Sequence, residues 1–141
     1  MIVAKAVALL LAAAALMQAS QPSAGVRTID RGMQSNIDST RQAVAHTEAE
    51  FAAIWKAHNY DKPAPAVDFA REMVVAVFMG SRPTGGFSVE IVSATERDGQ
   101  IVVSYRERMP SSDAITAQVL TSPYHIAAIG KSDKPVRFEK N

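Results

Sequence analysis

The chain has 141 residues, with 15 Lys and Arg against 14 Asp and Glu and no Cys. Without Cys there can be no disulfide and no lipidated N-terminal Cys. The basic residues are scattered among acidic ones, so counterion release on binding nucleic acid would be small, and nucleic acid is not an expected partner. A chain of this length suffices for one domain with a stable core.

The first 20 residues are typical of a secretory signal peptide. Lys5 is their only charge, and a continuous apolar run from Ala6 to Met17 follows it, before several small residues. This run is shorter than the roughly 20 residues that span a bilayer, so we expect no stable membrane span after cleavage, which is predicted near Ala19. The mature protein is therefore expected in the periplasm or outside the cell.

Removal of Lys5 leaves 14 basic residues against 14 acidic ones, so the mature chain is formally neutral. Residues 21–25 read as a flexible lead, and residues 26–141 as a single domain. Short alternating stretches at 26–34 and 41–46 flank a turn-like segment at 35–39, and this pattern predicts an N-terminal strand pair.

A helix is predicted over residues 47–59. Thr47 and Glu50 form a capping box at its start, and Asn59 is expected to end it in the left-handed region, before Pro63 and Pro65. One face carries Phe51, Ile54, Trp55 and His58 at helical spacing and should pack on a sheet. Trp55 is interpreted as a core anchor, with ligand stacking as the alternative.

The central stretch runs from residue 73 to residue 91. Met73–Met79 is apolar without interruption, which favours a strand covered on both faces. Gly85 and Gly86 follow Pro83 in a turn, which we interpret as a tight connection between antiparallel strands, because no helix or Lys follows to make a phosphate loop. Phe87 then begins an alternating strand.

The remainder is predicted to be β. Asp98-Gly99 indicates a hairpin between residues 88–94 and 101–108. Further strands are predicted at 115–120, 124–129 and 136–138, the last at a sheet edge. Strands on both sides of a single helix predict an α+β fold, a largely antiparallel sheet with the helix packed on it, with a β-sandwich-like fold as the alternative.

These blocks also carry a family resemblance. The run from Gly80 through Arg82-Pro83 and Thr84–Ile91, with the later pentapeptide Thr121–His125, resembles the C-terminal domain family of the protease complex subunit PrcB. The similarity covers about residues 68–138. It implies the fold of that family and an association with a protease, and it implies no catalytic residues.

Candidates for chemistry are few. Ser122, His125 and Asp113 could be drawn as a catalytic triad, but no elbow motif places them together. The histidines at 46, 58 and 125 lack the spacing of a metal site, so no metal or cofactor is expected. His58 is interpreted as a helix-end residue, and His125 as structural or partner-facing.

Glu90 alternates with apolar residues, so exposure to solvent is its ordinary interpretation. If both faces of its sheet are covered, Glu90 needs a partner such as Arg106 on the adjacent strand.

The leading hypothesis is an exported, non-enzymatic interaction domain that stabilises or assembles with an extracytoplasmic protease, through surface complementarity or strand addition. A small-ligand binding module with a cavity lined by Trp55, Phe78 or Phe87, and a small envelope hydrolase, are the alternatives. The partner-contact candidates are Arg82, Thr84, Gly85, Gly86, Phe87, Thr121, Tyr124 and His125.

Overall fold

The computed structural model of the protein describes residues 25–141, so the predicted signal peptide lies outside the described residues. The elements are β1 (Arg27–Gly32), β2 (Arg41–Ala45), α1 (Glu48–His58), β3 (Glu72–Phe78), β4 (Ser88–Arg97), β5 (Gln100–Arg108), β6 (Tyr124–Gly130) and β7 (Val136–Lys140). Within this part of the chain, no helix is long and apolar enough to cross a membrane.

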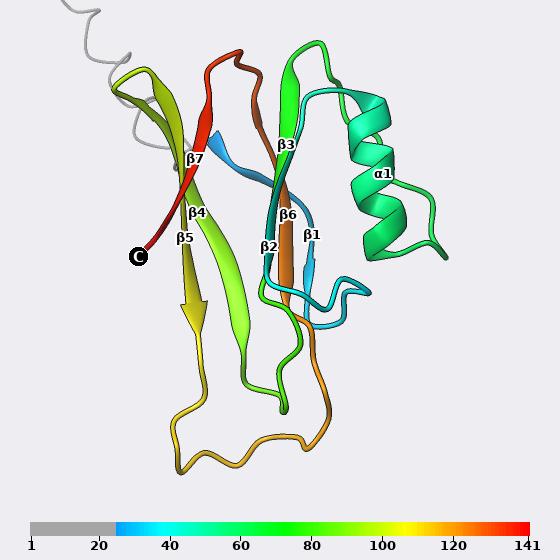
Figure 1. Cartoon of the computed structure of the whole chain (residues 1–141), viewed down its shortest axis with the longest axis vertical. Coiled ribbons are helices and arrows are strands. Elements are labelled where there is room, and N and C mark those ends of the chain that lie inside the picture. The colour runs from blue at the N-terminus through cyan, green and yellow to red at the C-terminus, as the bar shows by residue number, and fades with distance from the viewer. Residues whose placement is uncertain (1–24) are drawn as a thin grey trace, which may run out of the picture.

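The strands form two sheets rather than one. The first has the order β1-β6-β3-β2 with antiparallel neighbours throughout, and the second has the order β4-β5-β7, in which β7 runs parallel to β5. Figure 1 shows the sheets side by side, with α1 on the far side of the four-stranded sheet. The α+β prediction is confirmed, and the two packed sheets add a sandwich-like feature to it.

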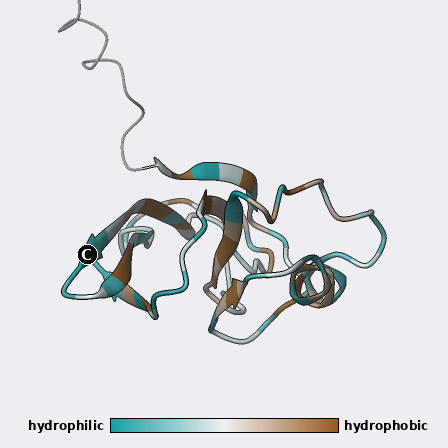
Figure 2. Ribbon diagram, turned by 90° about the horizontal axis from the view of Figure 1, so that it is seen from above, coloured by the Kyte–Doolittle hydropathy of each residue, from teal (hydrophilic) through white to brown (hydrophobic). Residues whose placement is uncertain are grey.

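Strand β3 explains why residues 73–79 are apolar throughout. Met73, Val75 and Val77 pack between the two sheets, whereas Val74 and Phe78 pack beneath α1. Because both faces of β3 are covered beyond its first residue, Glu72, no position from 73 to 78 favours a polar side chain. Figure 2, seen from above, shows these layers with apolar residues on the central strands.

Helix α1 is anchored as its sequence predicts, with two differences in its caps. Thr47 Oγ1 accepts the Glu50 N–H at 3.2 Å, but the Glu50 carboxylate accepts the N–H of His46, not that of Thr47. Asn59 has φ −156°, so the predicted left-handed end is wrong, and its N–H bonds to Trp55 O instead. Trp55 is buried and donates to Lys62 O at 2.8 Å, which confirms it as a core anchor.

The Asp98-Gly99 hairpin is confirmed. Both residues have positive φ, 53° and 75°, which gives a two-residue turn whose twist matches the joined strands β4 and β5.

Two predictions of strand pairing and one prediction of a strand were wrong. The strands predicted near the N-terminus exist as β1 and β2, but they lie at opposite edges of the four-stranded sheet and do not pair with each other. Strands β3 and β4 lie in different sheets, so the Gly turn is a crossover and not a hairpin. Residues 115–120 form no strand, because their backbone meets the Gly turn, which offers no ladder of hydrogen bonds.

Candidate interaction surface

Three connections meet at one end of the domain and are called here the loop surface: residues 33–40, 79–87 and 109–123. Figure 1 shows them together at the lower end, where β1, β3 and β5 finish. Backbone hydrogen bonds join them. Arg82 and Thr121 exchange two such bonds, Arg82 N–H to Thr121 O at 2.7 Å and Thr121 N–H to Arg82 O at 2.9 Å, and the Ser122 N–H donates to Met33 O at 2.8 Å.

The two glycines of the turn have different roles. Gly86 has φ 92°, and a Cβ there would lie 2.9 Å from Pro110 Cβ, so the long connection packs directly against it. Gly85 has no such strain, and its N–H donates to Ala117 O at 2.9 Å. The turn therefore requires glycine at 86 both for its backbone angle and for close packing.

Exposed apolar side chains gather on the loop surface. It holds five of the six large apolar residues that are exposed in residues 25–141: Met33, Met109, Ile115, Val119 and Leu120. Ile115 is fully exposed, at 101 %, so its side chain contributes no packing to this domain. Single exposed apolar residues are ordinary, but a concentration within one connection is typical of a surface that another molecule covers.

The predicted contact residues divide into exposed and buried groups. Arg82, Thr84 and Phe87 are half-buried and Gly86 is exposed, with the Arg82 guanidinium 5.8 Å from the centre of the Phe87 ring. The others are buried: Gly85, Thr121, Tyr124 and His125. The structure thus brings the two predicted segments together, through Arg82 and Thr121, and directs most of the second into the interior.

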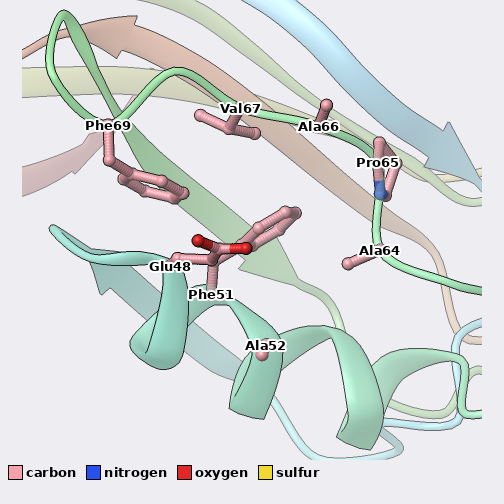
Figure 3. A pocket seen from close by; sticks show the side chains of 8 residues that line it. All are labelled: Glu48, Phe51, Ala52, Ala64, Pro65, Ala66, Val67 and Phe69. Carbon is pink, nitrogen blue, oxygen red and sulfur yellow. The ribbon is translucent and has the colours of Figure 1, made fainter.

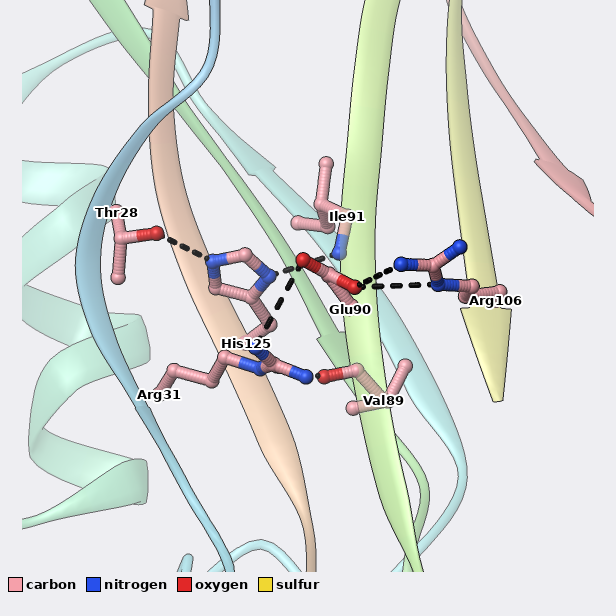
Figure 4. Close-up of polar contacts among 7 residues, drawn as sticks. All are labelled: Thr28, Arg31, Val89, Glu90, Ile91, Arg106 and His125. Carbon is pink, nitrogen blue, oxygen red and sulfur yellow. Dashed lines mark hydrogen bonds and ion pairs between the residues drawn. The ribbon is translucent and has the colours of Figure 1, made fainter. Parts of the chain in front are cut away.

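His125 joins the two sheets (Figure 4). Its side chain is 2 % exposed, its Nδ1 accepts the N–H of Ile91 at 2.8 Å, and its Nε2 lies 2.9 Å from Thr28 Oγ1. Because Nδ1 accepts a hydrogen bond, the neutral ring carries its proton on Nε2, which donates to Thr28. Burial, helped by the Arg31 charge and opposed by Glu90, lowers the pKa of His125 to about 4.

Ion pairs flank this histidine. Arg106 donates to Glu90 Oε1 from two nitrogens, at 3.1 and 2.8 Å, and this bond lowers the pKa of Glu90. The conditional prediction of a Glu90–Arg106 pair is confirmed, and Arg31 lies 3.8 Å from the same carboxylate. Arg31 also donates to Val89 O at 3.0 Å. Side chains of β1 and β6 thus occupy backbone groups on the edge of β4, which blocks strand addition there.

His58 lies at the end of α1 and is buried, as its place on the apolar face of the predicted helix indicated. Its side chain is 1 % exposed, with Ser35 Oγ 2.8 Å from Nδ1 and Asp30 Oδ2 3.0 Å from Nε2. Tyr124 covers the ring, with centroids 4.3 Å apart. Burial and the nearby Asp30 raise the pKa of Tyr124. The helical spacing of His58 with Trp55 predicted this burial, but nothing in the sequence indicated its polar partners.

The Ser35–His58–Asp30 chain does not have the geometry of a hydrolase triad. In such triads the nucleophile bonds Nε2 and the acid bonds Nδ1, which is the reverse of this arrangement. Ser35 Oγ also accepts the Ile37 N–H at 3.0 Å, and both atoms of that bond are buried. The chain of hydrogen bonds therefore fixes the end of α1 on the sheet.

The triad drawn from the sequence is not assembled. Both nitrogens of His125 bond to Ile91 and Thr28, and Asp113 accepts from Ser111, so neither is paired with Ser122. In residues 25–141, no group of three or more His, Asp or Glu side chains could hold a metal ion.

These features define a small α+β domain of two packed sheets and one helix, with an exposed apolar connection at one end. Residues 73–130 match the family model described as PrcB C-terminal. A comparison with curated proteins gave no significant match. A comparison with solved structures gave none either.

Proposed function

We propose that the protein is an exported, non-enzymatic interaction domain that stabilises or assembles with an extracytoplasmic protease. The observation that carries this proposal is the loop surface, where Ile115 and Leu120 are exposed on a connection fixed by backbone hydrogen bonds. The match of residues 73–130 to the PrcB C-terminal family model supports a protease as the partner, because the sequence resembles the family named after a protease complex subunit.

Fixed apolar loops suit protein recognition. Burying exposed apolar area against a partner is favourable, and a loop that is already ordered loses less conformational entropy on binding. The hydrogen bonds from Arg82 to Thr121 and from Gly85 to Ala117 order this loop before any partner arrives. Surface complementarity at the loop surface is therefore the mechanism, and the blocked edge of β4 takes no part in it.

Ile115→Asp and Leu120→Asp, made separately, are expected to abolish capture of a protease while leaving stability within about 0.5 kcal/mol of the parent, since both side chains are exposed. The measurement is affinity purification of the tagged mature protein from the envelope fraction of its own cells after mild crosslinking, read by mass spectrometry. Any protease recovered is then purified and recombined with each variant, with binding followed by analytical ultracentrifugation.

Ala70→Asp is the matched control. Ala70 is exposed and lies in the connection before β3, at the opposite end of that strand from the loop surface. The Ala70→Asp substitution adds the same negative charge as Ile115→Asp and should leave the complex intact. Recovery of the protein alone, or a protease that binds Ile115→Asp as tightly as the parent, would refute the proposed role.

Export has its own test. The mature protein should be found in the envelope or medium with a mass that corresponds to cleavage near Ala19, because the apolar run before it is too short to remain as an anchor. Intact mass spectrometry of the purified protein measures this directly. A full-length protein that begins at Met1 and stays in the cytoplasm would contradict export.

A further inference from the structure

A groove runs along α1, away from the loop surface. Two adjoining cavities, of about 320 Å³ and about 260 Å³, lie between α1 and the connection 59–69 and share Ala52 and Ala64 in their walls. Figure 3 shows the first cavity, with Phe51 and Glu48 on the helix facing Val67 and Phe69 on the connection. Trp55 and Tyr60 line the second.

The sequence keeps this groove open. Pro63 and Pro65 prevent the connection from continuing the helix, and the alanines at 64 and 66 are too small to fill the space beside α1. Both ends of the segment are held, one by the bond from Trp55 to Lys62 O and the other by Phe69, whose ring centre lies 6.1 Å from that of Phe51. The connection therefore cannot collapse onto the helix without breaking these contacts.

The charges along the groove are separated by sign. Glu48 lines the first cavity, and Lys56 and Lys62 line the second. None of these three side chains forms an ion pair or side-chain hydrogen bond within residues 25–141, where nine other ion pairs are made. The groove is thus apolar in its floor, acidic at one end and basic at the other.

The spacing of the charges suits an extended peptide. Glu48 and Lys56 are eight residues apart on α1, which corresponds to about 12 Å along the helix axis. An extended chain covers about 12 Å in roughly four residues. Apolar side chains between two such charges would lie over Phe51 and Trp55.

We propose that this groove binds an extended peptide segment in which a basic and an acidic residue, about four positions apart, flank small or apolar residues. Glu48 pairs with the basic residue, and Lys56 with Lys62 receives the acidic one. The site goes beyond the proposed assembly role and shares no residue with the loop surface, so substitutions can separate the two.

The test uses the mature protein and three acetylated, amidated peptides: Lys-Ala-Leu-Ala-Glu, its reverse Glu-Ala-Leu-Ala-Lys, and the neutral Gln-Ala-Leu-Ala-Gln. Backbone amide chemical shifts are followed as each peptide is titrated to about 1 mM, the weak end of specific binding. At least one charged peptide should bind about tenfold more tightly than the neutral one, with shifts at residues that line the groove. Binding should weaken at high salt.

Glu48→Gln and Lys56→Gln should each weaken binding of that peptide about threefold, the scale of one exposed ion pair. Asp133→Asn, which removes an exposed carboxylate outside the groove, is the control and should have no effect. Glu48→Lys should in turn recover affinity for a peptide whose Lys is replaced by Glu. Charged peptides that bind no more tightly than the neutral one, or a Glu48→Gln variant with unchanged affinity, would overturn the proposal.

Discussion

Gly80→Ala is expected to lower the free energy of unfolding by about 2 to 5 kcal/mol. Gly80 has φ 81°, where an L-residue is strained by about 1 to 2 kcal/mol. A Cβ at this position would also lie 2.8 Å from Thr40 N and 3.0 Å from Ser39 C, and overpacking of this kind costs about 1 to 3 kcal/mol. Both close atoms belong to the backbone, so no side-chain rotation can relieve the contact.

Substitutions at two other glycines separate the positive-φ strain from the backbone overpacking. The free energy of unfolding of each variant is measured by urea unfolding. Gly99→Ala introduces positive-φ strain alone, because no atom lies within 4 Å of the added Cβ, and should cost about 1 kcal/mol. Gly85→Ala meets only an ordinary contact, with Ala117 Cβ at 3.5 Å, and should cost less still. If Gly80→Ala were as stable as Gly99→Ala, the close approach of Gly80 to the turn before β2 would be refuted.

Gly80 fixes the point at which the chain leaves the four-stranded sheet. The Met79 N–H still bonds to Pro123 O at 2.9 Å, and one residue past Gly80 the Ser81 N–H bonds to Asp38 O at 2.9 Å. The backbone therefore passes directly over the 38–40 turn before it crosses to the second sheet. A side chain at 80 would push the crossover away from both connections.

The elements were predictable where a local pattern decides them. The uninterrupted run at 73–79, the turn at Asp98-Gly99 and the caps around Thr47 each depend on residues a few positions apart. Those signals gave β3 and α1 within one residue of their observed bounds, and the strands of the β4–β5 hairpin within three.

Pairing between distant strands was not predictable in this way. Alternation places Arg27–Gly32 and Arg41–Ala45 in strands, but nothing local says that β6, nearly a hundred residues later, lies between β1 and β3. The same holds for β3 and β4, whose separation into two sheets depends on β5 and β7. Sheet order is a property of the whole core, so sequence proximity was a poor guide to it.

The candidate site was predictable in part for a similar reason. The segments 82–87 and 121–125 do meet, yet the apolar surface comes from the connection 109–120, which the sequence led us to interpret partly as a strand. The hydrogen-bond partners of His125 and His58 have no local signal, because Ile91, Thr28, Ser35 and Asp30 come from other parts of the chain.

His125, which joins the two sheets, also sets the response of the protein to acid. His125 has a pKa of about 4 in the folded protein, and an unfolded His has a pKa of about 6.5. As pH falls below about 6.5 the unfolded chain binds a proton that the folded protein does not, so stability falls until about pH 4. The expected loss is about 3 kcal/mol, which is large beside the 5 to 15 kcal/mol typical of a domain.

The measurement is urea unfolding between pH 7 and pH 4 for the parent and for His125→Asn, whose amide oxygen can accept the Ile91 N–H but takes up no proton. The variant should be about 1 to 2 kcal/mol less stable at pH 7, because the bond to Thr28 is lost, and should show a shallower fall toward pH 4. Ring nitrogen shifts should also show a neutral His125 at pH 5, with its proton on Nε2. An equal pH dependence in parent and variant would mean that the proton-binding group responsible for acid sensitivity lies elsewhere, and that the bond from Ile91 to Nδ1 does not hold the ring neutral.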